Sequence, residues 1–344
     1  MYVRIQIYTQ QKEGALLASI KDVAKMAGVS VAAVSKYMKT PQNMREETRR
    51  KISHAIEVLN YRPNPLAQSL RTGKTNIIAI ALPEVGNPYF SEIFKYLQHY
   101  SEKRGLLAVL LNNSTLEQTK STISIIESGV VDGVIFYDNG QAGMMIQEAE
   151  LNVPMVKVVP QTHAEYPATV GIDLTTGIKK LCAHLEQTGV HTIAYVGPDN
   201  NASSRQKMQA IMDCCESGSL RLVQELYLSD YNYNSGYACA ADLVRSGVHL
   251  PDAIIVESDM SALGVLKGLT ERGIQIPRDV RISGYDNTDI SQMSTPSLTS
   301  VHIPLEEICT CALNMLCDIM NGKEVAPVYF ETDLQIRAST MPPV

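Results

Sequence analysis

The sequence predicts a small all-α head followed by a large α/β body built on parallel sheets. Two patterns predict this fold class. Apolar residues recur at helical spacing from Ser19 to Leu59, whereas after residue 75 short apolar runs alternate with helical stretches that end in glycine. The first pattern is typical of amphipathic helices around a small core, and the second of repeated strand–helix–strand units. The 344 residues are enough for two or three domains.

The first helix of the head is expected from about residue 20 to residue 27. The apolar residues at the i, i+3, i+4, i+7 spacing of one helix face are Ile20, Val23, Ala24 and Ala27. Ser19, with Asp22 three residues later, has the form of a capping box. Gly28 then supplies the permissive backbone of a tight turn.

Two more helices are expected behind that turn. Ser30 is placed to cap a second helix that carries Val31, Val34 and Met38. A third helix, from Glu46 to Leu59, has acidic residues in its first turn. Its apolar stripe consists of Ile52, Ala55, Ile56 and Leu59. The head is therefore either a three-helix interaction module or a helix-turn-helix whose second helix enters a major groove.

The charge distribution is uneven along the chain. Residues 19 to 74 hold eleven Lys and Arg against four acidic residues, a net of +7, although the whole chain has a net charge of −6. The 270 residues that follow carry a net charge of −14. A basic module on an acidic body is typical of a polyanion binder, and a solvated lysine-rich face would give the same count.

Glycines recur in the body at positions where helices are expected to end, and each would take the left-handed backbone conformation of a helix C-cap. They are Gly105, Gly129, Gly189, Gly247 and Gly273, each followed by a short apolar run. Because these runs are continuously apolar, they predict doubly wound parallel sheets with helices on both faces, and we expect two of them. A flavodoxin-like enzyme would show the same pattern, so the sheets name no function.

Motifs for catalysis and cofactors are missing from the sequence. It has no GxGxxG, GxxxxGK[ST], GxSxG or HExxH, its seven histidines are scattered singly, and its seven cysteines form no CxxC pair. We therefore expect no enzyme, no cofactor, no metal site and no disulfide framework. Apolar runs such as Ile77 to Leu82 are far shorter than the roughly 20 residues that span a bilayer, and no secretory signal is visible. A cytoplasmic, nucleoid-associated protein is expected.

Several long segments resemble one family. They are IKDVAKMAGVSVAAVSKYMK, EETRRKISHAIEVLNYRPNPLAQSLRTGKTNIIAIALPEVGNPYF, VDGVIFYDN, ESDMSALGVLKGLTERGIQIPRDVRISGYDNT and TPSLTSVHIPLEEI. In order and spacing they resemble the lactose-repressor family of bacterial transcription regulators, from Ser19 to about Thr340. The resemblance implies a helix-turn-helix head on a periplasmic-binding-protein-like body, in which three chain crossings join two subdomains.

The resemblance also implies the domain boundaries. Residues 1–18 fall outside it, and we interpret them as a disordered extension or a misassigned translation start. The head is expected at 19–62, a hinge helix or linker at 63–75, and the effector-binding and dimerisation body at 76–341. The N-subdomain would hold 76–172 and 303–325, and the C-subdomain 173–302 and 326–341.

The family pattern places DNA contacts on the head and the hinge. The second helix would read bases through Val31, Ala32 and Lys36, with Ser30 and Ser35 on phosphates. Lys36 can donate hydrogen bonds to guanine O6 and N7, while Val31 and Ala32 can only contact thymine methyl groups. We therefore expect few base-specific contacts from this helix. The hinge residues in question are Asn64, Ala67 and Leu70. Leu70 takes the position of a minor-groove wedge, unless it simply packs on the body.

The same pattern places a small-molecule site between the subdomains. Its expected residues are Tyr89, Phe90, Asn139, Arg205, Lys207, Tyr231, Ser258 and Asp286. In the family, the residue at the position of Asp286 accepts hydrogen bonds from ligand hydroxyls, and the residue at the position of Tyr231 stacks on the ligand. The alternative role for Asp286 is structural, as a cap of the next turn. Lys207 stands where the family usually has a ligand-clamping Arg, and lysine offers a point charge in place of a planar fork. Either the effector is unusual, or the ability of the protein to sense a small molecule has degraded.

The resemblance predicts a sequence-specific repressor of a carbohydrate-utilisation or related catabolic operon. It would bind a palindromic operator in double-stranded DNA as a homodimer, with its affinity set by a sugar-like effector. One alternative is a regulator of the same fold controlled by a phosphorylated carrier protein. The other is a solute-binding protein with a basic head, which would require a signal peptide.

Overall fold

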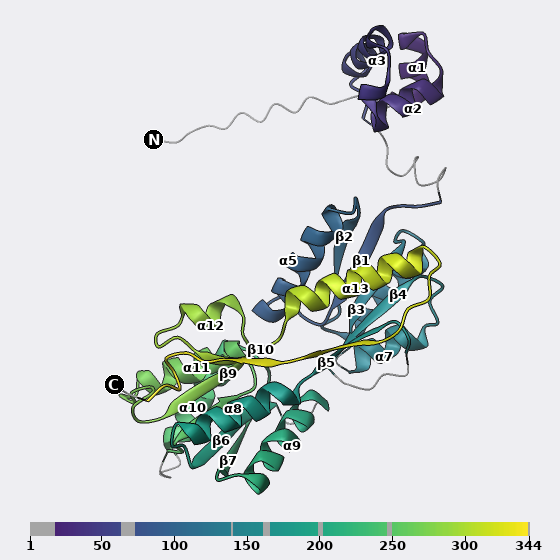
Figure 1. Cartoon of the computed structure of the whole chain (residues 1–344). Helices are drawn as coiled ribbons and strands as arrows, with labels where there is room; N and C mark the ends of the chain where they lie inside the picture. Colours follow the sequence, from purple (N-terminus) through teal and green to yellow (C-terminus); the bar gives the residue numbers. More distant parts are fainter. Residues whose placement is uncertain are drawn as a thin grey trace, which may run out of the picture. The chain divides into compact units, whose positions relative to one another are not determined.

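The chain forms two compact units, residues 1–75 and residues 76–344. A computed structural model describes residues 18–62, 73–138, 140–160, 166–198, 202–245 and 250–342 (Figure 1). We describe the first unit as the head and the second as the body, each by itself. No helix within these described ranges is long and apolar enough to cross a membrane.

The head consists of the three predicted helices. They are α1 (Ile20–Ala27), α2 (Val31–Lys39) and α3 (Glu46–Val58), with a short 3-10 turn at Pro41–Asn43. Ser19 and Asp22 form the predicted capping box, in which the Ser19 N–H donates to the Asp22 carboxylate at 2.8 Å. Gly28 follows α1 with a φ of 65°, and the Ser30 hydroxyl accepts the Ala33 N–H at 3.2 Å. The local signals thus set both ends of the turn between α1 and α2.

The apolar stripes of α1 and α3 close the core of the head. Its fully buried hydrophobic residues are Val23, Ala24, Ala27, Val34, Ile52 and Ala55. Of the three apolar residues expected on the second helix, Val34 is buried, whereas Met38 is 40% exposed, and Val31, expected on the outer face, is 37% exposed. Val31 and Met38 thus lie outside the core of the head.

Two six-stranded sheets form the body, as predicted. The first holds β1 (Ile77–Leu82), β2 (Leu107–Asn112), β3 (Gly133–Tyr137), β4 (Met155–Val159), β5 (Thr169–Asp173) and β11 (Val328–Glu331), in the order β11-β5-β4-β3-β1-β2. The second holds β6 (Thr192–Pro198), β7 (Arg221–Leu228), β8 (Ala253–Val256), β9 (Arg281–Asp286), β10 (Thr299–His302) and β12 (Asp333–Gln335), in the order β12-β10-β9-β8-β6-β7. All these pairings are parallel except that of β12 with β10.

Helices flank both sheets. Around the first sheet lie α5 (Pro88–Glu102), α6 (Leu116–Glu127), α7 (Gln141–Glu148) and α13 (Leu305–Met320). Around the second lie α8 (Thr175–Gln187), α9 (Ala202–Ser217), α10 (Tyr233–Arg245), α11 (Asp259–Thr270) and α12 (Asp289–Met293). Four of the five predicted glycine caps, Gly105, Gly129, Gly189 and Gly273, have φ between 70° and 83°. The fifth, Gly247, lies outside the described residues.

The chain passes between the two sheets three times. It leaves the first sheet after β5, returns after β10 and leaves again after β11. The last crossing corrects the expected subdomain boundary: β11 pairs with β5, with Phe330 beside Ile172, so the crossing lies near Thr332 and not near residue 326. The buried Thr332 hydroxyl donates to the Asp173 carbonyl at 2.8 Å and accepts the Gly177 N–H at 2.9 Å. These bonds tie two of the crossings together.

Replacing Gly264 with alanine is expected to destabilise the body by about 1–3 kcal/mol, through overpacking. A Cβ atom at Gly264 would lie 2.1 Å from the Tyr233 carbonyl oxygen, because the backbones of α10 and α11 touch at this glycine. Neither backbone can move away without separating two packed helices. Denaturant unfolding would measure the loss, with Lys267→Ala on the exposed face of α11 as the control. Equal midpoints for the two variants would contradict the close approach.

Candidate functional site

The outer face of α2 presents the residues expected to contact DNA. Val31, Ala32 and Lys36 are exposed, Ser35 is partly exposed, and none of them belongs to the core of the head. Ser30 is exposed too, and its oxygen already accepts a backbone N–H of α2, so that only its O–H remains for a phosphate. Asn64, Ala67 and Leu70 of the expected hinge lie outside the described residues.

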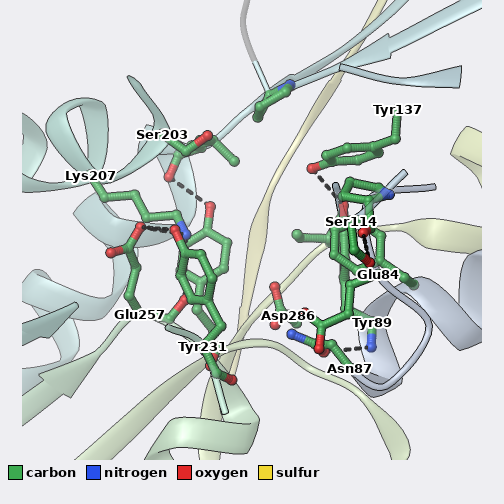
Figure 2. A pocket seen from close by; sticks show the side chains of 17 residues that line it. Glu84, Asn87, Tyr89, Ser114, Tyr137, Ser203, Lys207, Tyr231, Glu257 and Asp286 are labelled. Carbon is green, nitrogen blue, oxygen red and sulfur yellow. Dashed lines mark hydrogen bonds and ion pairs between the residues drawn. The ribbon is translucent and has the colours of Figure 1, made fainter. Parts of the chain in front are cut away.

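A cleft of about 370 Å³ opens between the two sheets of the body. This volume is in the range of small-molecule sites. Its lining consists of Pro83, Glu84, Asn87, Tyr89, Phe90, Ser114, Tyr137, Pro160, Leu174, Ser203, Lys207, Tyr231, Glu257, Ser258, Tyr285, Asp286 and Ile303 (Figure 2). Both subdomains contribute to it.

The topology explains why these residues meet. Tyr137 and Asp286 end strands β3 and β9, while Glu257 follows β8 directly. Tyr89 lies in the first turn of α5, after β1, and Tyr231 follows β7. The carboxyl edges of two parallel sheets thus face each other across the cleft, and this edge is where open α/β sheets bind their ligands.

One wall of the cleft is built on a buried ion pair. The Lys207 ammonium lies 3.2 Å from Oε1 of Glu257, and the two side chains are 7% and 1% exposed. Glu257 also accepts hydroxyl hydrogen bonds from Tyr195 at 2.6 Å and Ser204 at 2.8 Å. A further bond, at 3.3 Å, comes from the Tyr231 hydroxyl. A buried carboxylate that is paired and hydrogen-bonded in this way is well satisfied.

The surroundings of the pair hold its charges in place. The ammonium sits 3.8 Å from the centre of the Tyr285 ring, a cation–π distance. Burial, the largest single effect, lowers the pKa of Lys207, but the attractions to Glu257, Tyr231 and Asp286 together outweigh it, and the pKa ends above its ordinary value. Gly197 of β6 leaves the room that Glu257 needs, because a Cβ there would lie 2.2 Å from Oε2 of the carboxylate.

Asp286 occupies a strained backbone position at the end of β9. Its φ is 104°, a region that residues other than glycine rarely adopt, and such positions concentrate at ligand sites. Next to it, Asn287 donates its N–H to the Ser300 hydroxyl at 3.0 Å and accepts from Arg337 at 2.6 Å, which holds the turn. No hydrogen bond from the described residues reaches the Asp286 carboxylate.

Burial, followed by repulsion from Asp259, raises the pKa of Asp286 well above its usual range. Asp259 itself accepts the Thr288 N–H at 2.8 Å and the Ser300 hydroxyl at 2.5 Å. Because hydrogen bonds to a carboxylate favour its charged form, Asp286 is the acid of this pair that holds a proton more readily. The Asp286 carboxyl group lines the cleft, and it has no hydrogen-bond partner among the described residues.

Three aromatic rings form the opposite wall. Tyr89, Phe90 and Tyr137 meet edge to face, with ring centres 5.0 to 5.9 Å apart, and the two tyrosine hydroxyls lie 3.2 Å from each other. In Figure 2 Asp286 lies between this wall and the one that carries Lys207 and Glu257. A ring with polar substituents on its edge suits such a cleft, because aromatic faces and hydrogen-bonding groups alternate around it.

Two family models match the chain, one for each unit. Residues 19–64 match the model of the bacterial regulatory proteins of the lacI family. Residues 182–340 match the model of a periplasmic binding protein-like domain. The chain belongs to the lacI family of bacterial regulatory proteins. The helix-turn-helix interpretation of the head is thereby confirmed, and the interaction module without a DNA-binding role is set aside.

Relatives of this lacI-family chain align over nearly its full length. Catabolite control protein A of Staphylococcus epidermidis is 28% identical over 315 residues, which cover 90% of this chain and 94% of the relative. Among solved structures, the lac repressor dimer bound to operator and the anti-inducer ONPF has a TM-score of 0.82 at 24% identity, covering 94% and 99% of the two chains. A complex of the transcriptional regulator CelR with cellobiose has a TM-score of 0.70, also at 24% identity and with the same coverage. At 24% identity, these two structural similarities show that the fold is shared.

Six of the eight residues expected at the effector site of this lacI-family protein line the cleft. They are Tyr89, Phe90, Lys207, Tyr231, Ser258 and Asp286. Ser258 also caps α11, where its hydroxyl accepts the Ser261 N–H at 3.2 Å. Asn139 lies outside the described residues. Arg205 was wrongly assigned: it is exposed and absent from the lining, because two residues along α9 turn a side chain by about 200° from the face that carries Lys207.

Glu257 is the main residue that sequence reasoning missed. It follows the apolar run AIIV, just as Asp286 follows its own strand, and a charged residue at the carboxyl end of a buried strand was the available signal. Tyr137 and Tyr285 were missed for another reason, because their positions within strands made them resemble core residues. The described residues include no group of three or more His, Cys, Asp or Glu arranged to hold a metal ion.

Proposed function

We propose that this regulator represses a carbohydrate-utilisation or related catabolic operon and that a sugar-like effector in the cleft sets its operator affinity. The observation that carries the proposal is the cleft itself, which combines an unpaired carboxyl group, several hydroxyl groups and aromatic rings in one chain with a basic helix-turn-helix head. The names of the relatives, which refer to catabolite control, cellobiose and the lac repressor, support it. The protein would act in the cytoplasm on the nucleoid, as a homodimer on palindromic DNA, by binding and without catalysis.

A gel-shift titration tests the DNA half of this proposal. Lys36→Ala is expected to weaken operator binding by about 1–3 kcal/mol and to relax the preference at one base pair per half-site, if the ammonium reads a guanine. Each phosphate contact should add about −0.9 to the slope of log affinity against log salt. The operator probe is the palindrome in the protein's own promoter region.

A matched control separates base reading from general charge. Lys51, on the exposed side of α3, is paired with Glu47 at 2.7 Å, so Lys51→Ala removes one positive charge without touching α2. It should change affinity little. Uniform weakening across operator variants by Lys36→Ala would demote Lys36 to a phosphate contact, and salt-independent binding of the unmodified protein would contradict the regulator proposal.

The relatives named catabolite control protein A favour a second candidate, a regulator of the same fold controlled by a phosphorylated carrier protein. A thermal-shift screen separates the two. Sugars, polyols and nucleosides should raise the melting temperature of the body if the cleft is an effector site. If none of them does so and a phosphorylated carrier protein does, partner control replaces the effector proposal.

A further inference from the structure

The cleft contains one cation among its described lining residues, and that cation is already neutralised. Glu84, Glu257 and Asp286 are its acids, and Lys207 is its base. Lys207 and Glu257 satisfy each other at 3.2 Å, so the pair adds no net charge to the cavity. The ionisable groups left for a ligand are two acids, Glu84 and Asp286.

Several contacts keep Lys207 in this pairing. Its ammonium also lies 3.4 Å from the backbone carbonyl of Glu257 and rests on the ring of Tyr285. Glu257 is held from its other side by the Tyr195 and Ser204 hydroxyls. An incoming anion would have to pull the lysine out of this arrangement and leave a buried carboxylate without its counter-ion, which is strongly unfavourable.

The remaining groups favour the opposite charge. The Asp286 carboxyl faces the cleft without a hydrogen bond from the described residues, and Tyr89, Phe90 and Tyr137 present aromatic groups across from it. The Asp286 carboxyl group attracts an amine once it gives up its proton, and aromatic faces attract cations. Neutral hydroxyl groups can also donate to the same carboxyl oxygens.

We propose that Glu257 sets the charge selectivity of the cleft by occupying the Lys207 ammonium, so that the ligand is an uncharged or amine-bearing sugar-like ring and phosphorylated or carboxylated analogues are excluded. The proposal rests on the proposed function of the cleft as an effector site. It makes Glu257 a specificity-determining residue.

The test uses inorganic phosphate and sulfate as probes, because they need no knowledge of the effector. The full chain is compared as wild type, Glu257→Gln and the double variant Lys207→Gln/Glu257→Gln, in phosphate or sulfate against chloride at matched ionic strength. In Glu257→Gln the ammonium has lost its carboxylate partner, so phosphate should raise the melting temperature by about 3–5 °C at about ten times its dissociation constant. The wild type keeps the cation paired and the double variant lacks it, so both should show only the smaller, common shift that these excluded anions give to any folded protein.

Two results would overturn the proposal. One is phosphate stabilisation of the wild type equal to that of Glu257→Gln, and the other is equal behaviour of Glu257→Gln and the double variant. If Glu257→Gln does not fold, the comparison is made with Glu257→Asp, whose carboxylate is one methylene shorter and draws back from the lysine. That variant should show a smaller phosphate shift of the same sign, and no shift in it would overturn the proposal as well.

A matched set of sugars distinguishes this inference from the proposed function. Glucose, glucosamine and glucose 6-phosphate share one ring and differ in charge, and corresponding sets exist for other sugars. Stabilisation of the wild type by the phosphorylated member alone would overturn the charge selectivity while supporting an effector site. If no sugar of any kind stabilises the wild type, the effector function fails, and the phosphate comparison still decides the role of Glu257.

Discussion

Replacing Lys207 with methionine is expected to destabilise the body by about 3–5 kcal/mol. Methionine fills a similar volume but leaves Glu257, whose side chain is 1% exposed, as a buried carboxylate without its counter-ion. Removing one partner of a buried pair costs this much because the remaining charge has lost both water and its neutraliser. The measurement is the free energy of unfolding in urea, followed by circular dichroism at neutral pH.

The double variant Lys207→Met/Glu257→Gln is the control for this prediction. Glutamine keeps the length of the glutamate and can still bond the Tyr195 and Ser204 hydroxyls, but it carries no charge. Most of the lost stability should therefore return, since neutral replacement of both partners of a buried pair is often tolerated. A loss below about 1 kcal/mol in the single variant would show that the hydroxyl groups alone satisfy Glu257.

Much of the fold was predictable because its signals are local. The capping box of Ser19 and Asp22 and the left-handed Gly28 act within a few residues, so a sequence can display them directly. The same holds for the glycines that end helices and for the continuously apolar strands of the two sheets. The exposure of Met38 was not predictable in this way, since it depends on how much of α2 its neighbours cover.

Most residues that line the candidate site were predictable through the family pattern, but the pairing among them was not. Asp286 and Tyr231 could be placed in the cleft through the family pattern. The role of Lys207 could not, because its partner Glu257 is 50 positions away and the pair exists only after β8 and α9 have packed. From the sequence alone, Lys207 is interpreted as a weaker substitute for the ligand-binding arginine of the family. In the structure, its charge is neutralised by Glu257. Arg205 failed for a simpler reason, the helical turn between it and Lys207.

Asp286→Ala is expected to abolish the response to effector while leaving operator binding unchanged. In the absence of its carboxyl group, ligand hydroxyls that enter the cleft would find no acceptor at the end of β9, and each unsatisfied donor costs about 1–3 kcal/mol. Affinity for the sugar that stabilises the wild type most should fall at least about tenfold, measured by calorimetry. Asp286 belongs to the body, so operator affinity in the absence of sugar should match that of the wild type in a gel shift.

Two further variants make this result interpretable. Asp286→Asn keeps one carbonyl acceptor and the length of the side chain, so its affinity for the sugar should fall between those of wild type and Asp286→Ala. Asp242→Ala removes an exposed acid of α10 that does not line the cleft, and it should bind the sugar as the wild type does. Because Asp286 has a φ of 104°, which asparagine tolerates better than alanine, Asp286→Asn also keeps the backbone of the turn closer to that of the wild type. Equal sugar affinity in Asp286→Ala and Asp242→Ala would remove Asp286 from the effector site, leaving the aromatic wall and Tyr231 as the groups that hold the ligand.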